Sequence, residues 1–329
     1  MQPELMTANA PGIPDAELTT ADRAESLRRR LEDLEDAYGP AIRRARQTAG
    51  CTDIAMNEDG SIWTTVGGTT APTGESLTNP AARRIVNLVS DIDNHPIEKA
   101  ALSANLPTGE RFAALLPPTV RRIIFSIRLP PGRVFTLDDY VASGIMIEGQ
   151  ADTLRRAVSE RRNILIVGGT GAGKSTLANA LLAEPDFQAS RTCIIQDQDE
   201  LKCSGHNVVR AFTGAMTARE LVREFLRHNP DRIVIGEIRD GATALEWIGA
   251  SNTGHPGGLS TAHANSAAHG LSRISRLVGQ VAVNVPHADI VEAVELVAFI
   301  QRERDGSRRL VEVARPVRHD GERYRTEPA

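Results

Sequence analysis

The chain has 329 residues, 41% of them hydrophobic and 24% charged, which is typical of a soluble globular protein with room for two domains. A net charge of −4 and a pI near 6.1 argue against a basic field over the whole chain, although a local basic groove for nucleic acid stays open. Three cysteines without a C-x-x-C pair favour a reduced, cytoplasmic setting over a disulfide framework. We expect no signal peptide and no transmembrane segment, since the apolar runs are too short.

The N-terminal part alternates between helix and strand patterns. Residues 1–22 are predicted to be a disordered tail. Leu27, Leu31, Leu34 and Tyr38 then recur at helical spacing until Gly39-Pro40 breaks the pattern. A hairpin over 53–66, a helix starting at Thr78 and strands within 100–129 follow. These elements predict an α+β domain over 23–130.

A linker region is predicted over 131–150, because Pro130-Pro131-Gly132 is the strongest breaker in the chain. A helical stretch over 136–162 leads into the domain predicted over 151–329. There, strands alternate with helices, which predicts an α/β fold with a parallel sheet covered on both faces. The helix from Thr217 opens with a capping box, and a hairpin is expected over 297–317. The strands are expected at 163–167, 191–196, 208–212, 232–236 and 258–262.

A phosphate-binding loop of the form G-x-x-x-x-G-K-S lies between the apolar run 164–167 and the helical run 176–182. This strand–loop–helix context is what the motif requires. Lys174 is expected to reach the β- and γ-phosphates, and the Ser175 hydroxyl to hold Mg²⁺. We expect the lysine side chain to be mostly exposed without ligand. The candidate nucleotide-binding residues are Gly168, Gly169, Thr170, Gly171, Ala172, Gly173, Lys174, Ser175 and Thr176.

Acidic residues follow two of the predicted strands. Glu237 ends the strand 232–236, where a P-loop ATPase carries its water-orienting acid; Gly236 replaces the usual preceding aspartate, so Glu237 is the candidate general base. Asp197 and Glu200 follow the strand 191–196 and are expected to help position Mg²⁺ and water, because ligands bind beyond the carboxyl ends of parallel strands. The alternative for this pair is a charged surface loop.

Two histidines are candidates for contacts with the nucleotide. His263 follows the predicted strand 258–262 and could sense the γ-phosphate, whereas His255 lies in a turn-rich loop and is the weaker candidate. A structural role is the alternative for both, since their spacing matches no metal site.

Taken in order, these motifs resemble the Walker A, Asp box, Walker B and His box of the secretion ATPase superfamily. The N-terminal segments 55–63, 109–118 and 125–128 are similar to those of its conjugative type IV secretion branch. The resemblance spans about residues 25–315. It implies a RecA-like P-loop ATPase domain behind a smaller N-terminal domain, with ATP and Mg²⁺ bound between the domains. It also implies a homohexamer that powers pilus assembly and substrate transfer with inner-membrane components of the secretion system.

By the same resemblance, Arg111 and Arg128 are candidates for phosphate contacts from the N-terminal domain, a role suited to arginine's fixed charge and forked donors. The protein is expected in the cytoplasm, at the inner face of the membrane. Direct DNA contact stays open, and the charge balance disfavours nucleic-acid binding as the primary function.

Two alternatives remain. The first is a type II secretion or type IV pilus ATPase, although the four-cysteine zinc insertion common in that group is absent. The second is a nucleotide-dependent scaffold with little hydrolysis. Gln196 favours the scaffold, because the family's Asp box usually begins Ile-Glu-Asp; Glu237 argues against it. On the resemblance, we expect Gln196→Glu to raise turnover modestly.

Overall fold

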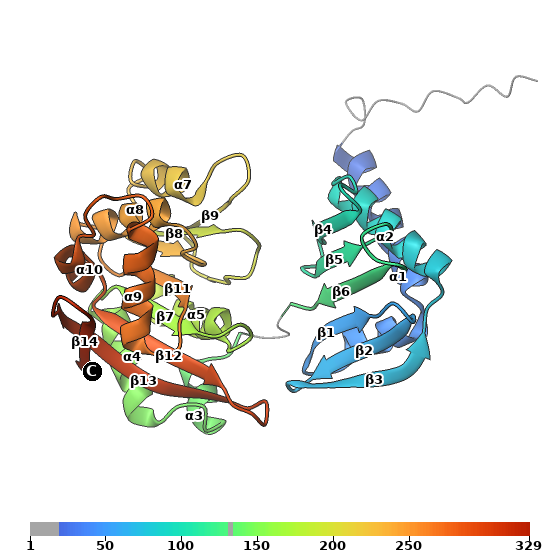
Figure 1. Cartoon of the computed structure of the whole chain (residues 1–329). Helices are drawn as coiled ribbons and strands as arrows, with labels where there is room; N and C mark the ends of the chain where they lie inside the picture. The colour runs from blue at the N-terminus through green and yellow to red at the C-terminus, as the bar shows by residue number, and fades with distance from the viewer. Residues whose placement is uncertain (1–19, 131–133) are drawn as a thin grey trace, which may run out of the picture. The chain divides into compact units, whose positions relative to one another are not determined.

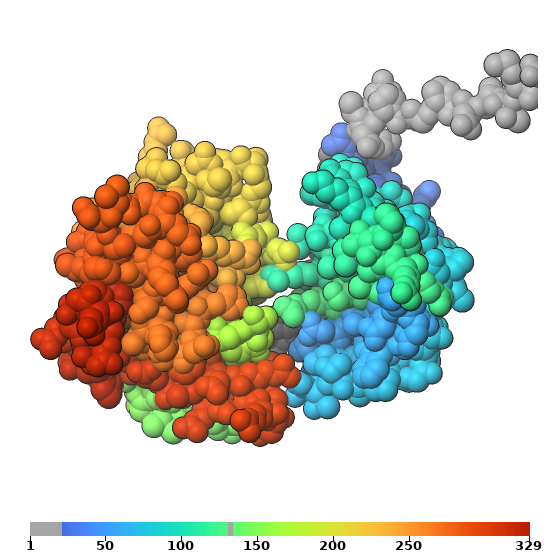
Figure 2. Space-filling view, in the orientation of Figure 1, coloured from blue at the N-terminus to red at the C-terminus, as the bar shows by residue number. Residues whose placement is uncertain are grey.

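The computed structural model describes residues 20–130 and 134–329 (Figure 1). The chain divides into two compact units, Met1–Pro130 and Pro131–Ala329. Most of the predicted tail lies outside the described residues, but its last three positions belong to the first helix, which starts at Thr20. Side chains fill the spaces between the ribbons within each unit (Figure 2). In the described part of the chain, no helix has both the length and the apolar composition needed to cross a bilayer.

The first unit is a six-stranded antiparallel sheet in the order β3-β2-β1-β6-β5-β4, with two helices. The predicted hairpin and the strands within 100–129 are confirmed. Strand β3 was not predicted, because its side chains are mostly exposed and carry no apolar alternation. The elements are α1 (Thr20–Gln47), β1 (Cys51–Met56), β2 (Ser61–Val66), β3 (Thr69–Ser76), α2 (Asn79–Asp93), β4 (Ala101–Asn105), β5 (Arg111–Leu115) and β6 (Ile124–Arg128).

Helix α1 is interrupted where the sequence predicts a break. Gly39 has a φ of 68°, and Pro40 starts a second helical segment after it. Proline suits this position because the first turn of a helix leaves its N–H groups unpaired. Leu34 and Tyr38 before the kink and Ile42 after it are buried in the core shared by α1, α2 and the sheet. Helix α2 starts as predicted, with Thr78 accepting a capping bond from the N–H of Ala81.

The second unit is an eight-stranded sheet in the order β14-β13-β12-β7-β11-β10-β8-β9. Strands β12 through β9 in this order are parallel, and β13 and β14 are antiparallel additions. The five predicted strands are confirmed to within one residue at either end. The strands are β7 (Ile164–Gly168), β8 (Thr192–Gln196), β9 (Val208–Phe212), β10 (Arg232–Ile235), β11 (Leu259–His263), β12 (Leu296–Arg302), β13 (Arg308–His319) and β14 (Tyr324–Pro328).

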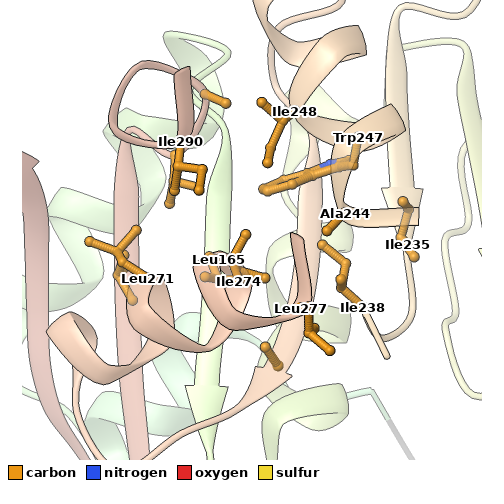
Figure 3. Packing of buried hydrophobic residues seen from close by; sticks show 14 of the residues in the cluster. Leu165, Ile235, Ile238, Ala244, Trp247, Ile248, Leu271, Ile274, Leu277 and Ile290 are labelled. Carbon is orange, nitrogen blue, oxygen red and sulfur yellow. The ribbon is translucent and has the colours of Figure 1, made fainter. Parts of the chain in front are cut away.

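Helices cover both faces of this sheet, as the strand–helix alternation predicts. Alternate residues of β7 point to opposite faces: Leu165 and Val167 join the core under α7–α10, and Ile164 and Ile166 join the core under α3–α6. Trp247 is the largest buried side chain of the first of these cores (Figure 3). The helices are α3 (Leu137–Ala142), α4 (Glu148–Ser159), α5 (Lys174–Leu182), α6 (Pro185–Gln188), α7 (Ala218–Phe225), α8 (Gly241–Asn252), α9 (Ala267–Val278) and α10 (His287–Ala293).

The predicted linker over 131–150 is longer than the structure allows. The boundary between the units falls within Pro130-Pro131-Gly132, but α3 already packs into the second unit. Leu137, Tyr140 and Met146 are each at most 3% exposed there. The sequence predicts a helix here, within 136–162, but its burial against the second unit shows only in the folded chain.

Strand β14 and helix α10 meet at the end of the chain. The rings of His287 and His319 stack with centroids 3.8 Å apart and an interplanar angle of 2°. The Tyr324 hydroxyl lies 2.8 Å from His287 Nδ1. This cluster joins α10 to both antiparallel strands. The C-terminal hairpin is confirmed, but β14 is short and mostly polar and was not predicted.

Candidate nucleotide-binding and hydrolysis site

The phosphate-binding loop connects β7 to α5. Gly171 and Gly173 have φ values of 70° and 99°, which L side chains rarely adopt. Gly173 caps α5 without a side chain, so the N–H groups of the first helical turn face the loop. Backbone donors and the positive end of the helix dipole together form an anion-binding site.

The individual loop residues differ in exposure. Gly169, Thr170 and Gly171 form an exposed tip, Ala172 is buried, and Thr176 is half-buried in the first turn of α5. Gly168 lies against β12: a Cβ at this position would lie 2.3 Å from the carbonyl oxygen of Ile300. The first glycine of the motif is therefore required by strand packing.

Lys174 is only 8% exposed, so the expectation of a mostly exposed side chain is wrong. Its ammonium donates to the carbonyl oxygens of Gly168 at 3.2 Å and Gly169 at 3.0 Å, and lies 3.3 Å from His263 Nδ1. Burial lowers the pKa of Lys174, and the nearby Glu237 carboxylate opposes that shift. The loop itself thus provides the partners that fold the lysine inward.

His263 and Glu237 extend this contact toward β10. His263 Nε2 lies 3.2 Å from Glu237 Oε1. Burial and the Lys174 charge lower the pKa of His263, which favours the neutral ring. Since the ammonium can only donate to Nδ1, the neutral tautomer carries its proton on Nε2 and donates to Glu237. The three side chains form one hydrogen-bonded line across the strand ends.

Arg239 joins Glu237 to the loop after β8. Its guanidinium lies 3.2 Å from Glu237 Oε2 and 2.5 Å from Asp197 Oδ2. Asp197 also accepts a hydrogen bond from the Thr213 hydroxyl at 2.6 Å. Both oxygens of Asp197 therefore have partners other than Ser175, the other residue expected to hold the metal.

Glu200 is the acid that the structure brings to Ser175. The serine hydroxyl donates to Glu200 Oε2 at 2.9 Å. A hydroxyl and a carboxylate oxygen are donors suited to Mg²⁺, which is usually held by one or two protein oxygens together with water and phosphate. The described residues contain no cluster of three His, Cys, Asp or Glu side chains placed for a metal. The donors present fit an ion that arrives with the nucleotide.

Two amide side chains, not predicted from sequence, position Glu200. Gln196, 4% exposed, accepts from the backbone N–H groups of Glu200 at 3.1 Å and Leu201 at 2.8 Å. Asn179 donates to the Glu200 carbonyl at 2.9 Å and accepts from the Lys202 N–H at 2.8 Å. Asn179 lies four residues after the loop serine, a polar residue on the buried face of α5, and that pattern is the signal that could have identified it.

Of three other predicted residues, two lie in the first unit and one lies at the other end of β11. Arg111 and Arg128 belong to the first unit, where they are cross-strand partners on β5 and β6. Arg128 Nε donates to Asp53 Oδ1 at 2.8 Å. His255 precedes the start of β11, whereas His263 is the last residue of that strand. The two histidines are therefore at opposite ends of the same strand, and only His263 joins the loop.

A parallel sheet that presents a glycine-rich loop, a lysine and strand-end carboxylates at one edge defines a RecA-like P-loop protein. Residues 79–313 match the family described as "Type II/IV secretion system protein", and the chain belongs to that family. The resemblance to secretion ATPases is thereby confirmed.

Curated relatives extend the match over nearly the whole chain. "Conjugal transfer protein TrbB" of Rhizobium radiobacter is 37% identical over 311 residues, covering 91% of this chain and 94% of the relative. "Probable conjugal transfer protein TrbB" of Sinorhizobium fredii (strain NBRC 101917 / NGR234) is 37% identical over 316 residues, covering 93% and 95%. The predicted similarity to the conjugative branch is confirmed.

Solved structures agree on the fold. The ATPase DotB of Legionella pneumophila has a TM-score of 0.57 at 21% identity, covering 91% of this chain and 81% of that one. The pilus retraction motor PilT with bound ADP has a TM-score of 0.59 at 18% identity, covering 89% and 80%. The expected α/β fold with a RecA-like ATPase domain is confirmed.

Proposed function

We propose that this chain is the ATP-hydrolysing motor of a conjugative type IV secretion system, coupling hydrolysis to pilus assembly and substrate transfer. The observation that carries the proposal is the line Lys174–His263–Glu237 at the loop, with Ser175 and Glu200 beside it. The TrbB relatives, which match almost end to end, support the conjugative assignment.

The loop binds the phosphates through backbone N–H groups and Lys174. On nucleotide binding, the lysine ammonium exchanges the carbonyls of Gly168 and Gly169 for β- and γ-phosphate oxygens. Both states satisfy its donors, so the exchange costs little. Ser175 and Glu200 hold Mg²⁺, which neutralises phosphate charge when it is bound.

Glu237 orients and deprotonates the attacking water. A carboxylate at the end of β10 lies beyond the sheet edge, where the γ-phosphate is expected. His263 holds one carboxylate oxygen and Arg239 the other, so the side chain keeps one orientation. When Lys174 turns to the phosphates, His263 loses that contact, which links Glu237 to nucleotide occupancy.

The working assembly is a homohexamer at the cytoplasmic face of the inner membrane, in contact with inner-membrane components of the secretion system. Arg111 and Arg128 contribute phosphate contacts from the first unit. These assignments go beyond family membership. Substitution of Arg111 and Arg128 tests the phosphate contacts, and mass measurement tests the hexamer.

The scaffold alternative loses its main support. Gln196 uses its amide to hold the backbone of Glu200 and Leu201, so it does not stand in for a missing base at the phosphates. Glu237 and Glu200 supply the carboxylates that hydrolysis needs.

Phosphate release by the purified protein tests the proposal. Wild type should release phosphate from ATP with Mg²⁺, and Lys174→Ala should abolish release because the main cation for the β- and γ-phosphates is lost. Lys99→Gln, at an exposed lysine of the first unit, is the control and should keep the wild-type rate. A wild type that binds ATP without releasing phosphate would establish the scaffold instead; full turnover in Lys174→Ala would remove the loop from the mechanism.

A further inference from the structure

Arg308, at the start of β13, packs against the phosphate-binding loop. A Cβ built on Gly173 would lie 3.2 Å from Arg308 Cδ and 3.5 Å from its Nε. The same Cβ would lie 3.7 Å from Ile300 Cδ1 of β12. The arginine side chain therefore covers the residue that caps α5, and a side chain at this position would require the arginine to shift.

The guanidinium of Arg308 has no protein partner that would account for this position. Across residues 20–130 and 134–329, Arg308 forms no ion pair and no side-chain hydrogen bond. The residue is half-buried, so part of its charge is removed from water. The Arg308 charge acts on the buried phenol of Tyr140, whose pKa is raised by burial, so that phenol stays neutral and offers no counter-charge.

A cation is unfavourable at this end of a helix. The N-terminus of α5 carries partial positive charge, which favours anions and disfavours lysine and arginine. Arg308 and Lys174 both lie there, and among the described residues no carboxylate is paired with Arg308. Bound phosphate would turn this repulsion into attraction for both side chains.

The sheet order indicates which end of the nucleotide Arg308 would contact. Strand β13 lies two positions to one side of β7, and β10, which carries Glu237, lies two positions to the other side. Glu237 and His263 thus mark the γ-phosphate side of the loop. Arg308 lies on the opposite side, against Gly173 at the start of α5, and thus on the side away from Glu237 and His263.

We propose that Arg308 is a nucleotide-binding residue that contacts the α-phosphate end of bound ATP or ADP and takes no part in γ-phosphate chemistry. The proposal rests on the nucleotide binding proposed above. An interaction made equally with substrate, transition state and product strengthens binding and leaves the chemical step unchanged.

Equilibrium binding of a fluorescent ADP, together with steady-state ATP hydrolysis, tests this role. Arg308→Gln should weaken ADP binding and raise KM for ATP by about tenfold or more, the usual effect of losing one charge-assisted hydrogen bond, with kcat within about twofold. Arg308→Lys should recover part of the affinity because it keeps the charge. Arg309→Gln, at the exposed neighbouring residue of β13, is the control and should match wild type.

Three results would overturn the role of Arg308. ADP affinity equal to wild type in Arg308→Gln would remove the contact. A fall in kcat with unchanged ADP affinity would place the arginine at the γ-phosphate. Weaker binding accompanied by a lower melting temperature without nucleotide, and not recovered in Arg308→Lys, would make it a packing residue. Failure of the wild type itself to bind ADP would instead contradict the proposed function, so the two failures are distinguishable.

Discussion

Glu237 is held by two side chains of different charge, a neutral histidine and an arginine. Glu237→Gln keeps the shape and most hydrogen bonds but loses basicity. Hydrolysis should fall by about 100-fold or more while ATP still binds, measured as phosphate release beside nucleotide affinity. Glu246→Gln, which changes a carboxylate paired with Arg219 and Arg223 away from the loop, is the control. An unchanged rate with intact binding would move the base to Glu200.

Gln196 has a different role from the one its place in the motif suggests. In Gln196→Glu, one carboxylate oxygen can keep both backbone donors, and the exposed Asp199 can turn to Lys202. The rate should therefore stay within about twofold of wild type, in place of the rise expected from the resemblance. Gln196→Ala should lower it by about tenfold, because the Glu200 backbone loses its acceptor.

Steady-state phosphate release across a Mg²⁺ titration separates these outcomes. A partial rescue of Gln196→Ala by high Mg²⁺ would agree with a displaced Glu200. A several-fold gain in Gln196→Glu at unchanged ATP affinity would show that a carboxylate here acts in turnover directly.

The site residues that are predictable from sequence are those that belong to a local motif with a known chemical role. Lys174 and Ser175 belong to a fixed spacing, and Glu237 follows a buried strand. Gln196 and Asn179 act through the loop 197–202, which they reach only after folding. The position of Asn179 on the buried face of α5 marks it as unusual, but no local pattern indicates its partners. The inward turn of Lys174 was missed for the same reason, since His263 lies 89 residues away.

At the scale of the elements, the contact between α10 and the last two strands should respond to acid. Burial, with the charge of His319 as a second cause, lowers the pKa of His287 in the folded chain. Below about pH 6.5 the unfolded chain takes up a proton that the folded chain resists, so stability is lost as pH falls. The melting temperature should drop between pH 7.5 and 5.5.

His287→Phe tests this contribution, because it keeps an aromatic ring but removes the titrating group. Its melting temperature should fall less over the same interval. His263, whose pKa is also lowered, contributes in the same direction in both proteins and cancels in the comparison. His228→Gln, at an exposed histidine on the surface, should follow wild type. Equal falls in wild type and His287→Phe would contradict the assignment.

Elements with strong apolar patterns were predictable and those with polar surfaces were not. Strands β7, β8 and β10 are continuous buried runs, and the sequence predicts their limits to within a residue. Strands β3 and β14 lie at sheet edges, where pairing partners rather than side-chain burial define them. The helical pattern runs through the end of α3 into α4, because Gly144, with a φ of 72°, ends the first helix without a change in the apolar spacing.

At the scale of the whole molecule, a motor of this kind should close into a ring, since heterologous contacts that repeat around an axis end only when the ring is complete. With ATP and Mg²⁺, mass measurement should find six chains of 35.5 kDa, about 213 kDa in total. Lys174→Ala, which should bind nucleotide poorly, is expected to assemble less. A strictly monomeric wild type at every concentration tested, with nucleotide present, would count against the motor.

The two-part organisation was visible in outline because Pro130-Pro131-Gly132 separates two different alternation patterns. The family followed from the order of four motifs, a global property that no single motif carries. The N-terminal limit of the second unit is harder to predict from sequence, because α3 and α4 are assigned to that unit by the residues they bury in its core.

The close approach of Gly168 to Ile300 determines which residues of this loop can be substituted during evolution. The lysine and the exposed tip are needed only while nucleotide is bound, so a lineage that abandoned nucleotide could replace Lys174 and Thr170 freely. Gly168 would stay, because any side chain there would push β12 away from β7. The motif thus contains residues under two different constraints, some required by the nucleotide and one, Gly168, required by the packing of β12. A homologue that no longer binds nucleotide would lose the first kind before the second.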